Sequence, residues 1–156
     1  MTTPHIQING EVLVPTANIR RIRIVTDDDR ASLASLGNHV DPEKFHTRLQ
    51  YADGSKTYAI ETIDEIAAQG ADLVQIAEGA FVPGQNIKSA RNVTPDDRRD
   101  FEARLGRPMR DDFKSQVETR AGLVLATVAA DTVMRRLGQP YQPVKSTETQ
   151  EQTMAP

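Results

Sequence analysis

The side chains best able to bind a metal ion in this sequence are three histidines and one run of acids. His5, His39 and His46 lack the i, i+4 spacing that places two imidazoles on one helix face, and no HExxH motif is present. Surface or hydrogen-bonded roles therefore fit them better than metal ligation. The acids at 27–29 could hold Mg²⁺ with help from elsewhere, but consecutive acids also stabilise the start of a helix. We expect the helix start and no metal site.

Catalytic motifs are also absent from the sequence. The chain has no cysteine, which excludes disulfides, thiolate catalysis and thiolate metal sites. It lacks GxGxxG, the phosphate-binding loop motif and GxSxG, and nothing resembles a nucleophile paired with a base. We therefore predict a protein that is not an enzyme and that needs no cofactor.

Basic residues occur at matching places in two similar segments. These are LVPTANIRRIRIV, residues 13–25, and FVPGQNIKSARNV, residues 81–93, which align at an offset of 68 residues. Both contain Val-Pro, then Asn-Ile, then basic side chains. Proline cannot donate to a strand ladder and asparagine tolerates turn geometry, so the repeat would suit a strand-turn-strand corner that is used twice. The alternative is a duplicated element that binds nucleic acid through Arg20, Arg21, Arg23, Lys88 and Arg91.

Both segments are expected to lie in a sheet. Residues 1–93 show period-2 alternation of apolar side chains between turn signals, including hairpin turns at Asn9-Gly10 and Asp53-Gly54. The acids at 27–29 and a capping threonine at 62 predict two short helices. The sequence thus predicts an α+β fold in which a twisted, mainly antiparallel sheet with two short helices forms the domain 1–93.

From residue 94 the pattern of apolar residues becomes helical. A helix is expected from Thr94 to Gly106, with a favourable residue at each end. A second, longer helix is expected over residues 110–137, which would complete a helical hairpin, 94–138. Its segment 121–134 is apolar nearly all round, so it must be covered on more than one side. We predict that it is buried between subunits, in an interface that contains Val117, Ala121, Val124 and Val128.

The remaining features concern the tail, the location and the partners. Residues 139–156 are rich in proline and polar side chains and are expected to form a flexible tail. No N-terminal apolar run follows a basic start, and no window approaches the ~20 apolar residues that span a bilayer. This favours a cytoplasmic protein that does not contact membranes. A net charge of -3 argues against a protein that coats nucleic acid nonspecifically.

Three segments between Glu11 and Val93 follow one another as an opening strand, a hairpin and helix, and a closing strand-turn-strand. They are LVPTANIRRIRI, LQYADGSKTYAIETIDEIAAQG and LVQIAEGAFVPGQNIKSA. Their order resembles the LytTR-type DNA-binding domain of bacterial response regulators. The resemblance implies a LytTR-like sheet domain over residues 11–93 and sequence-specific DNA binding. The chain departs from that family at Glu78, because the family's closing segment carries a polar and basic run that contacts DNA.

Together these features predict a non-catalytic binding and assembly module. We expect a homo-oligomer or a larger protein assembly joined through the long C-terminal helix. This profile suits a structural or accessory protein of a virus or mobile element, placed in the cytoplasm or the virion. The alternative is a sequence-specific DNA-binding transcriptional regulator that uses the basic repeat strands.

Overall fold

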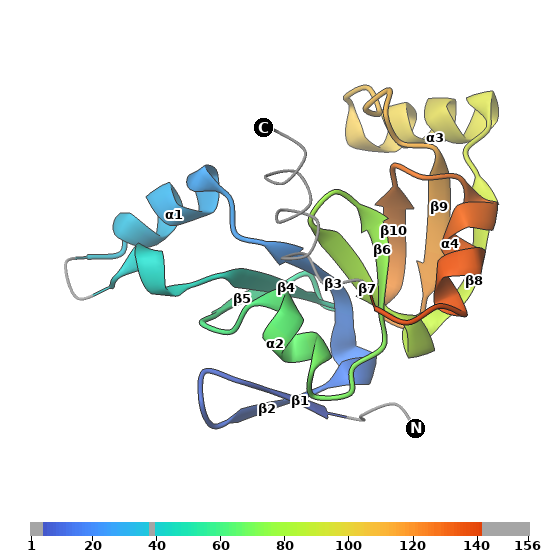
Figure 1. Ribbon diagram of the computed structural model, residues 1–156. Helices are drawn as coiled ribbons and strands as arrows, with labels where there is room; N and C mark the ends of the chain where they lie inside the picture. Colours follow the sequence, from blue (N-terminus) through green and yellow to red (C-terminus); the bar gives the residue numbers. More distant parts are fainter. Residues whose placement is uncertain (1–4, 38–39, 142–156) are drawn as a thin grey trace, which may run out of the picture.

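The computed structural model describes residues 5–37 and 40–141, which form two similar units in succession (Figure 1). The first unit comprises β1 (His5–Ile8), β2 (Val12–Pro15), the 3-10 turn η1 (Thr16–Asn18), β3 (Ile19–Ile24), α1 (Asp27–Ala34), η2 (Pro42–Lys44), β4 (Thr47–Tyr51), β5 (Lys56–Ala59) and α2 (Ile63–Ala67). The second comprises β6 (Leu73–Ala77), β7 (Ala80–Pro83), η3 (Gly84–Asn86), β8 (Ile87–Asn92), α3 (Pro95–Leu105), β9 (Ser115–Thr119), β10 (Gly122–Ala126) and α4 (Ala130–Leu137). Apart from η2, the order of elements is the same.

The strands form three antiparallel sheets, so the chain is an α+β protein, as predicted. The hairpin β1-β2 stands as a two-stranded sheet, and β10-β9-β8 form a three-stranded one. The five-stranded sheet has the order β5-β4-β3-β7-β6 and takes strands from both units. Its central strand is β3, and the hairpin β6-β7 of the second unit is attached to it.

The sequence repeat is the visible part of this longer structural repeat. In each copy Val-Pro ends a strand, a 3-10 turn follows, and isoleucine begins the next strand. The predicted strand-turn-strand corner is therefore confirmed. The backbone bonding also repeats at the same offset: Val25 N donates to His46 O over 3.1 Å. In the second unit the matching bond runs from Val93 N to Lys114 O, over 2.9 Å.

Two apolar clusters form the core, one for each unit. In the first, α2 packs through Ile63 and Ile66 against β1, β3 and β4. Leu73 and Phe81 of the second unit's hairpin also belong to this cluster. In the second cluster, α4 packs through Val133 against β6, β8 and β9. The hairpin β6-β7 thus contributes to both cores and joins the units.

The predicted helical hairpin is confirmed only at its first helix. α3 begins after the cap Thr94 and ends at Gly106, which has φ +68°. The prediction of one long helix over 110–137 is wrong, because the strands β9 and β10 lie within that range and α4 is helical only from Ala130. Along β9, buried side chains alternate with more exposed ones, which is the period of a strand and not of a helix.

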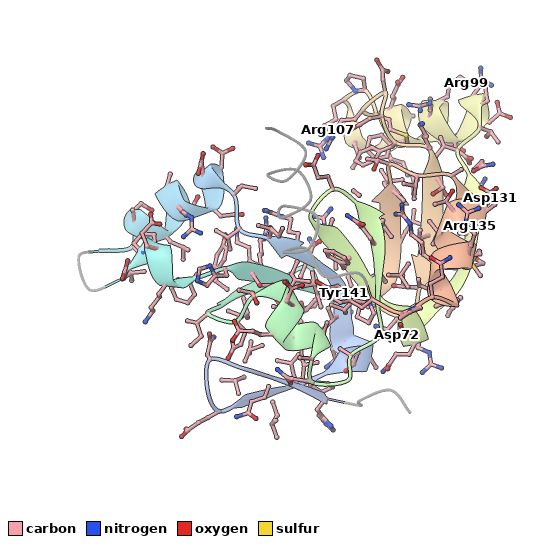
Figure 2. The ribbon with its side chains drawn as sticks, in the orientation of Figure 1. Asp72, Arg99, Arg107, Asp131, Arg135 and Tyr141 are labelled. Atoms are coloured by element: carbon pink, nitrogen blue, oxygen red, sulfur yellow. The ribbon has the colours of Figure 1, made fainter. Side chains whose placement is uncertain are left out.

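The predicted tail is wrong at one described residue. Tyr141 packs its ring against Phe81, with the ring centroids 5.8 Å apart. Its hydroxyl donates to Asp64 Oδ1 over 2.5 Å. Figure 2 shows Tyr141 in the middle of the molecule, between the elements of the two units. The rest of the predicted tail, 142–156, lies outside the described residues.

Candidate functional site

The strand β8 differs from its equivalent, β3, in having one edge without a neighbouring strand. β3 lies between β4 and β7, whereas β8 pairs only with β9 in the described part of the chain. Ile22 in β3 is buried, but the matching Ala90 in β8 is only partly buried. The helix α4 packs more closely on β8 than α2 packs on β3, and Ala130 N at its start donates to Asn92 Oδ1 over 2.9 Å.

The direction of the backbone groups of β8 follows from the ladder that it forms with β9. In an antiparallel pair, successive N–H groups point alternately to the two sides of the strand. Because Val93 N donates to Lys114 O on the β9 side, the N–H groups of Ala90 and Asn92 point to the open edge. This edge can accept hydrogen bonds from another strand, and natural proteins normally cover such edges. It is the first candidate binding site.

The four residues predicted to form an oligomer interface lie inside the chain instead. Val117 and Val124 are buried, and they face each other across the β9-β10 pair. Ala121 is buried in the turn between these strands, and Val128 is partly buried beside the same cluster. The apolar stretch is covered on more than one side, as expected, but by the chain's own β6, β7 and α4. Within one chain these side chains therefore pack in the core, and their role in a subunit interface stays a prediction.

Two of the five predicted nucleic-acid-binding residues are held in equivalent ion pairs. Arg23 donates two hydrogen bonds to the Asp29 carboxylate, over 2.7 and 3.0 Å. Arg91 does the same to Asp97, over 2.7 and 2.8 Å. In both units the acid is also the third residue of a helix and part of a capping box with the preceding threonine. These arginines fix the start of a helix against a strand.

The two acids differ in their surroundings. Burial alone would raise the pKa of Asp29, but hydrogen bonds from Arg23 and Thr26 and the charge of Arg23 hold it well below its usual range. Arg48 lies 3.6 Å away, and the Tyr58 hydroxyl donates to the same carboxylate over 3.1 Å. For Asp97, hydrogen bonds from the Arg91 side chain and from the Thr94 backbone lower the pKa to about 2.

Arg20 and Arg21 belong to a basic surface that the sequence did not reveal in full. They line a hollow of about 320 Å³ together with Gln50, Phe101, Arg107, Phe113, Leu123, Val124 and Leu125. Burial, followed by the charges of Arg23, Arg48 and Arg20, lowers the pKa of Arg21. No ion pair of Arg21 with an acid is present in the described residues. We call this hollow, with its arginines Arg20, Arg21 and Arg107, the arginine hollow. It is the second candidate site.

Lys88 lies on β8 and does not line the arginine hollow, and its amino group is 3.9 Å from the Glu118 carboxylate. The five predicted basic residues thus divide between two strands in different sheets. Arg107 was not among the predicted binding residues, because positive and negative side chains balance over residues 94–120. Figure 2 shows Arg107 at the end of α3 nearer the five-stranded sheet, and Arg99 towards the other end.

The described residues contain no group of three His, Cys, Asp or Glu side chains that could hold a metal ion. His39 lies outside these residues. The acids at 27–29 occupy the first turn of α1, as expected of a helix start. No helix within the described part of the chain is long and apolar enough to cross a membrane.

Comparison of the chain with protein-family models, with curated proteins and with solved structures found no match. The internal repeat therefore supplies the comparison from which a function can be argued.

Proposed function

We propose that this protein is a non-catalytic assembly module that binds a partner protein along the open edge of β8. One observation carries the proposal: the equivalent edge of β3 already holds a strand, β7, within the same chain. Pairing on that edge buries Ile22, whereas Ala90 on β8 stays partly exposed. An added strand would supply hydrogen bonds to the β8 backbone and would cover Ala90.

The charges on β8 do not prevent such pairing. Charged side chains often protect a strand edge from unwanted partners, and β8 carries Lys88 and Arg91. The equivalent strand β3 has three arginines and is nevertheless paired on both sides. Arg91 is held by Asp97. The edge therefore keeps its ability to bind a strand.

The test is the mean mass in solution, measured by sedimentation over a wide concentration range. We expect species above the monomer mass whose fraction rises with concentration. Ala90→Pro should lower the mean mass, since proline removes an N–H that points to the open edge without removing a bond to β9. Ala90→Val is the matched control, because it keeps the N–H and resembles Ile22. A wild-type chain that is monomeric throughout, with Ala90→Pro unchanged, would contradict the proposal.

We also propose an alternative function, sequence-specific DNA binding through the arginine hollow. It is favoured by Arg21, which has no acidic partner in the described chain and lies beside two further arginines. Arginines without acidic partners attract phosphate, and such contacts dominate affinity for DNA. The phenylalanines of the same hollow offer surfaces on which a base or a deoxyribose could pack.

Binding to a labelled duplex, followed by fluorescence anisotropy, tests this alternative. Arg21→Gln and Arg107→Gln should each weaken binding and reduce its dependence on salt between about 50 and 200 mM. Arg99→Gln is the control, because Arg99 pairs with Asp96 and does not line the hollow. If all three variants bind DNA equally, or if the wild type does not bind at low salt, the alternative is wrong.

A further inference from the structure

The hairpin β1-β2 is the part of the fold with the fewest strand partners. It forms a two-stranded sheet, and the outer edge of β2 has no strand beside it in the described residues. Isolated two-stranded hairpins are marginally stable in water. Two large apolar side chains of β2 are also exposed: Val12 by 50% and Leu13 by 65%. The hairpin therefore has both an open backbone edge and an apolar surface to cover.

The second unit contains the same hairpin with its edge filled. β6-β7 matches β1-β2 at the offset of 68 residues, since Ile6 faces Val14 and Val74 faces Val82. In this copy the outer edge of β7 pairs with β3. Phe81, which corresponds to Leu13, is only 2% exposed, and Ala80, which corresponds to Val12, is 8% exposed. In the second unit β3 covers this edge, and Phe81 also packs against Tyr141.

We propose that the partner on β8 is a second copy of this chain, whose β1-β2 hairpin repeats the seating of β6-β7 on β3. This inference rests on the proposed assembly function and specifies its partner and register. Within the chain, Ile22 faces Phe81 and Arg23 faces Ala80. Between chains, Ala90 therefore faces Leu13 of the second copy, and Arg91 faces its Val12.

One backbone bond of the seam can be carried over in the same way. Ile24 N donates to Gly79 O over 2.9 Å, which extends the β3-β7 ladder by one step. The corresponding donor is Asn92 N, which points to the open edge of β8, and the corresponding acceptor is the carbonyl of Glu11. The edge of β8 thus supplies the hydrogen-bond donor, and the edge of β2 supplies the acceptor.

The hairpin is held in place before any partner arrives. Gln7 and Gln69 exchange two hydrogen bonds, from Gln7 N to Gln69 Oε1 over 2.7 Å and from Gln69 Nε2 to Gln7 O over 2.8 Å. The Asn9 side chain accepts from Ile60 N over 2.9 Å and donates to Tyr58 O over 3.1 Å. All of these bonds lie on the β1 side and leave the outer edge of β2 open. Such preorganisation reduces the entropy lost on binding.

The turns that follow the hairpins give a second match. Asn86 is buried and donates to Thr16 O and Ile19 O, over 2.9 and 3.0 Å, which ties the second unit to the first. Asn18 is the equivalent residue and is exposed. In the proposed seam, Asn18 of the second copy donates to the carbonyls of Gly84 and Ile87. The proposed seam would therefore give Asn18 the buried environment that Asn86 already has.

The surface beside β2 gives a third match, in shape. A hollow of about 450 Å³ is lined by Leu13, Val14, Pro15, Asn18, Tyr51, Ala52 and Asp53. In the second unit the corresponding surface is covered by the first unit. A Cβ built on Gly122 would lie 3.1 Å from Arg20 Nε. The hollow is thus the place that the preceding copy fills in the proposed seam.

The charges across the seam are also complementary. The residues corresponding to Arg20 and Gly122 are Lys88 and Gly54, so Lys88 of one copy approaches the turn that contains Asp53 of the next. Lys88 and Asp53 are both exposed and carry opposite charges. Opposite charges at the edge of an interface favour association and help to set its register.

This contact is head-to-tail, because β8 of one copy binds β2 of the next. Such a heterologous contact leaves one free end on each side of a dimer, and it produces a closed ring or an open filament according to the rotation per copy. Both assemblies contain the same seam. Within one chain, the pairing of β7 with β3 is already one contact of this kind.

Cysteine pairs can test the register directly, since the chain has no cysteine of its own. Leu13→Cys chains mixed with Ala90→Cys chains should form a disulfide-linked dimer under mild oxidation. Residues directly opposite in an antiparallel ladder have Cα atoms ~5.5 Å apart or less, which suits a disulfide. Leu13→Cys mixed with Lys88→Cys is the control, because two residues of displacement place the Cα atoms beyond the ~7 Å that a disulfide spans.

A charge placed on the exposed face of β2 tests the same seam without cross-linking. Leu13→Glu should shift the sedimentation profile towards monomer. Leu36→Glu is the matched control, because Leu36 is 64% exposed, nearly as much as Leu13, and lies after α1. The inference is supported if only the Leu13-Ala90 mixture cross-links and only Leu13→Glu dissociates the assembly.

The failures of the two proposals can be told apart. Equal cross-linking in both cysteine mixtures, with no effect of Leu13→Glu, would overturn the hairpin as the occupant of the β8 edge. If Ala90→Pro still lowered the mass in that case, the proposed assembly function would stand with a different occupant. A wild-type chain that is monomeric at every concentration would overturn both.

Discussion

The two units share an order of elements but differ in what lies on their outer strands. In the first unit β3 is covered on both edges, and its inward residue Ile22 is buried. In the second unit β8 is covered on one edge, and Ala90 at the same position is small and partly exposed. For the hairpins the order is reversed: β7 of the second unit is buried, whereas three of the four residues of β2 in the first unit are exposed. The environment of each copy is thus set by its neighbour and not by its own fold.

The helix caps of the units make the same comparison at a smaller scale. Both caps join a threonine, an acid and an arginine from the preceding strand. Asp29 additionally contacts Arg48 and Tyr58, whereas the Asp97 cap gains Gln116, which accepts a bond from Arg91. A local motif that repeats in sequence can therefore differ in the number of distant partners that depend on it.

The largest expected effect tests whether the second unit has a core of its own. Val124→Asp places a carboxylate among buried apolar side chains and should lower the free energy of unfolding by about 4 kcal/mol or more. Leu123→Asp is the matched control on the same strand, because Leu123 is 48% exposed. Urea unfolding followed by circular dichroism measures both. A folded Val124→Asp chain of lower mass would instead restore the predicted subunit interface.

The next effect separates the two caps. Asp29→Ala leaves the half-buried Arg23 and Arg48 without their acid and should cost about 3 kcal/mol of unfolding free energy. Asp97→Ala should cost less, because Arg91 is exposed and can be solvated. Both variants are compared with the wild type by urea unfolding at neutral pH. Equal losses would show that the additional partners of Asp29 contribute nothing.

Acid should remove the same contributions in the wild type. Asp97 titrates near 3.8 when free and at about 2 in the folded chain, so the folded chain binds fewer protons between these values. Its contribution is complete above about pH 4 and is lost as the pH falls towards 2. Asp29, with a pKa also below its usual range, adds to the loss. The acid dependence of the urea midpoint should therefore be weaker in Asp29→Ala and in Asp97→Ala.

A smaller effect concerns the contact that closes the two units together. Tyr141→Ala removes a ring that packs on Phe81 and should cost about 2 kcal/mol of unfolding free energy. Tyr141→Phe keeps the ring and loses only the hydrogen bond to Asp64, so it should cost about 1 kcal/mol. Thermal unfolding at one protein concentration measures both. No loss in either variant would show that the contacts of Tyr141 do not contribute to stability.

The smallest expected effect tests whether Lys88 lies in the seam between copies as Arg20 lies between the two units. Lys88→Glu should weaken self-association by up to about fivefold, the range of an exposed ion pair. A chain that also carries Asp53→Lys should recover, because the two charges of the seam are then exchanged. Lys114→Glu serves as the control for the change in net charge. Sedimentation at low salt gives the dissociation constants, and an unrecovered double variant would remove this pair from the seam.

Local signals in the sequence predicted their elements well. The capping threonines placed the starts of α2 and α3, and Gly106 placed the end of α3, because caps satisfy backbone groups within one turn of the helix. Asn9-Gly10 and Asp53-Gly54 predicted two hairpins, with positive φ at the residues that need it. Each of these signals acts on backbone groups a few residues away, so the elements could be predicted without knowledge of distant neighbours.

The segment 115–133 shows where local signals fail. The spacing of Val117, Val124 and Val128 fits one face of a helix. In the structure Val117 lies on β9 and Val124 on β10, and the two buried residues face each other across this hairpin. A signal did exist in the sequence. Gly122 stands 68 residues after Gly54, so extending the repeat beyond residue 93 would have predicted a second hairpin in place of the helix.

The candidate sites were found only in part for a related reason. The basic residues of the repeat were evident, but the sequence could not show that Arg23 and Arg91 are held by acids of the following helix. It also could not bring Arg107 beside Arg20 and Arg21, because these residues belong to different units. Proximity between units depends on how one hairpin docks on another strand, and no short pattern encodes that.

By itself the sequence determined the caps, the hairpin turns and the two copies of the Val-Pro corner, since these depend on backbone chemistry between near neighbours. The tertiary structure alone decided which edges are filled. The second unit follows the first in the chain, so its hairpin occupies β3, while no third unit follows within the described residues to occupy β8. The same corner therefore ends in a buried strand in one unit and in an open edge in the other.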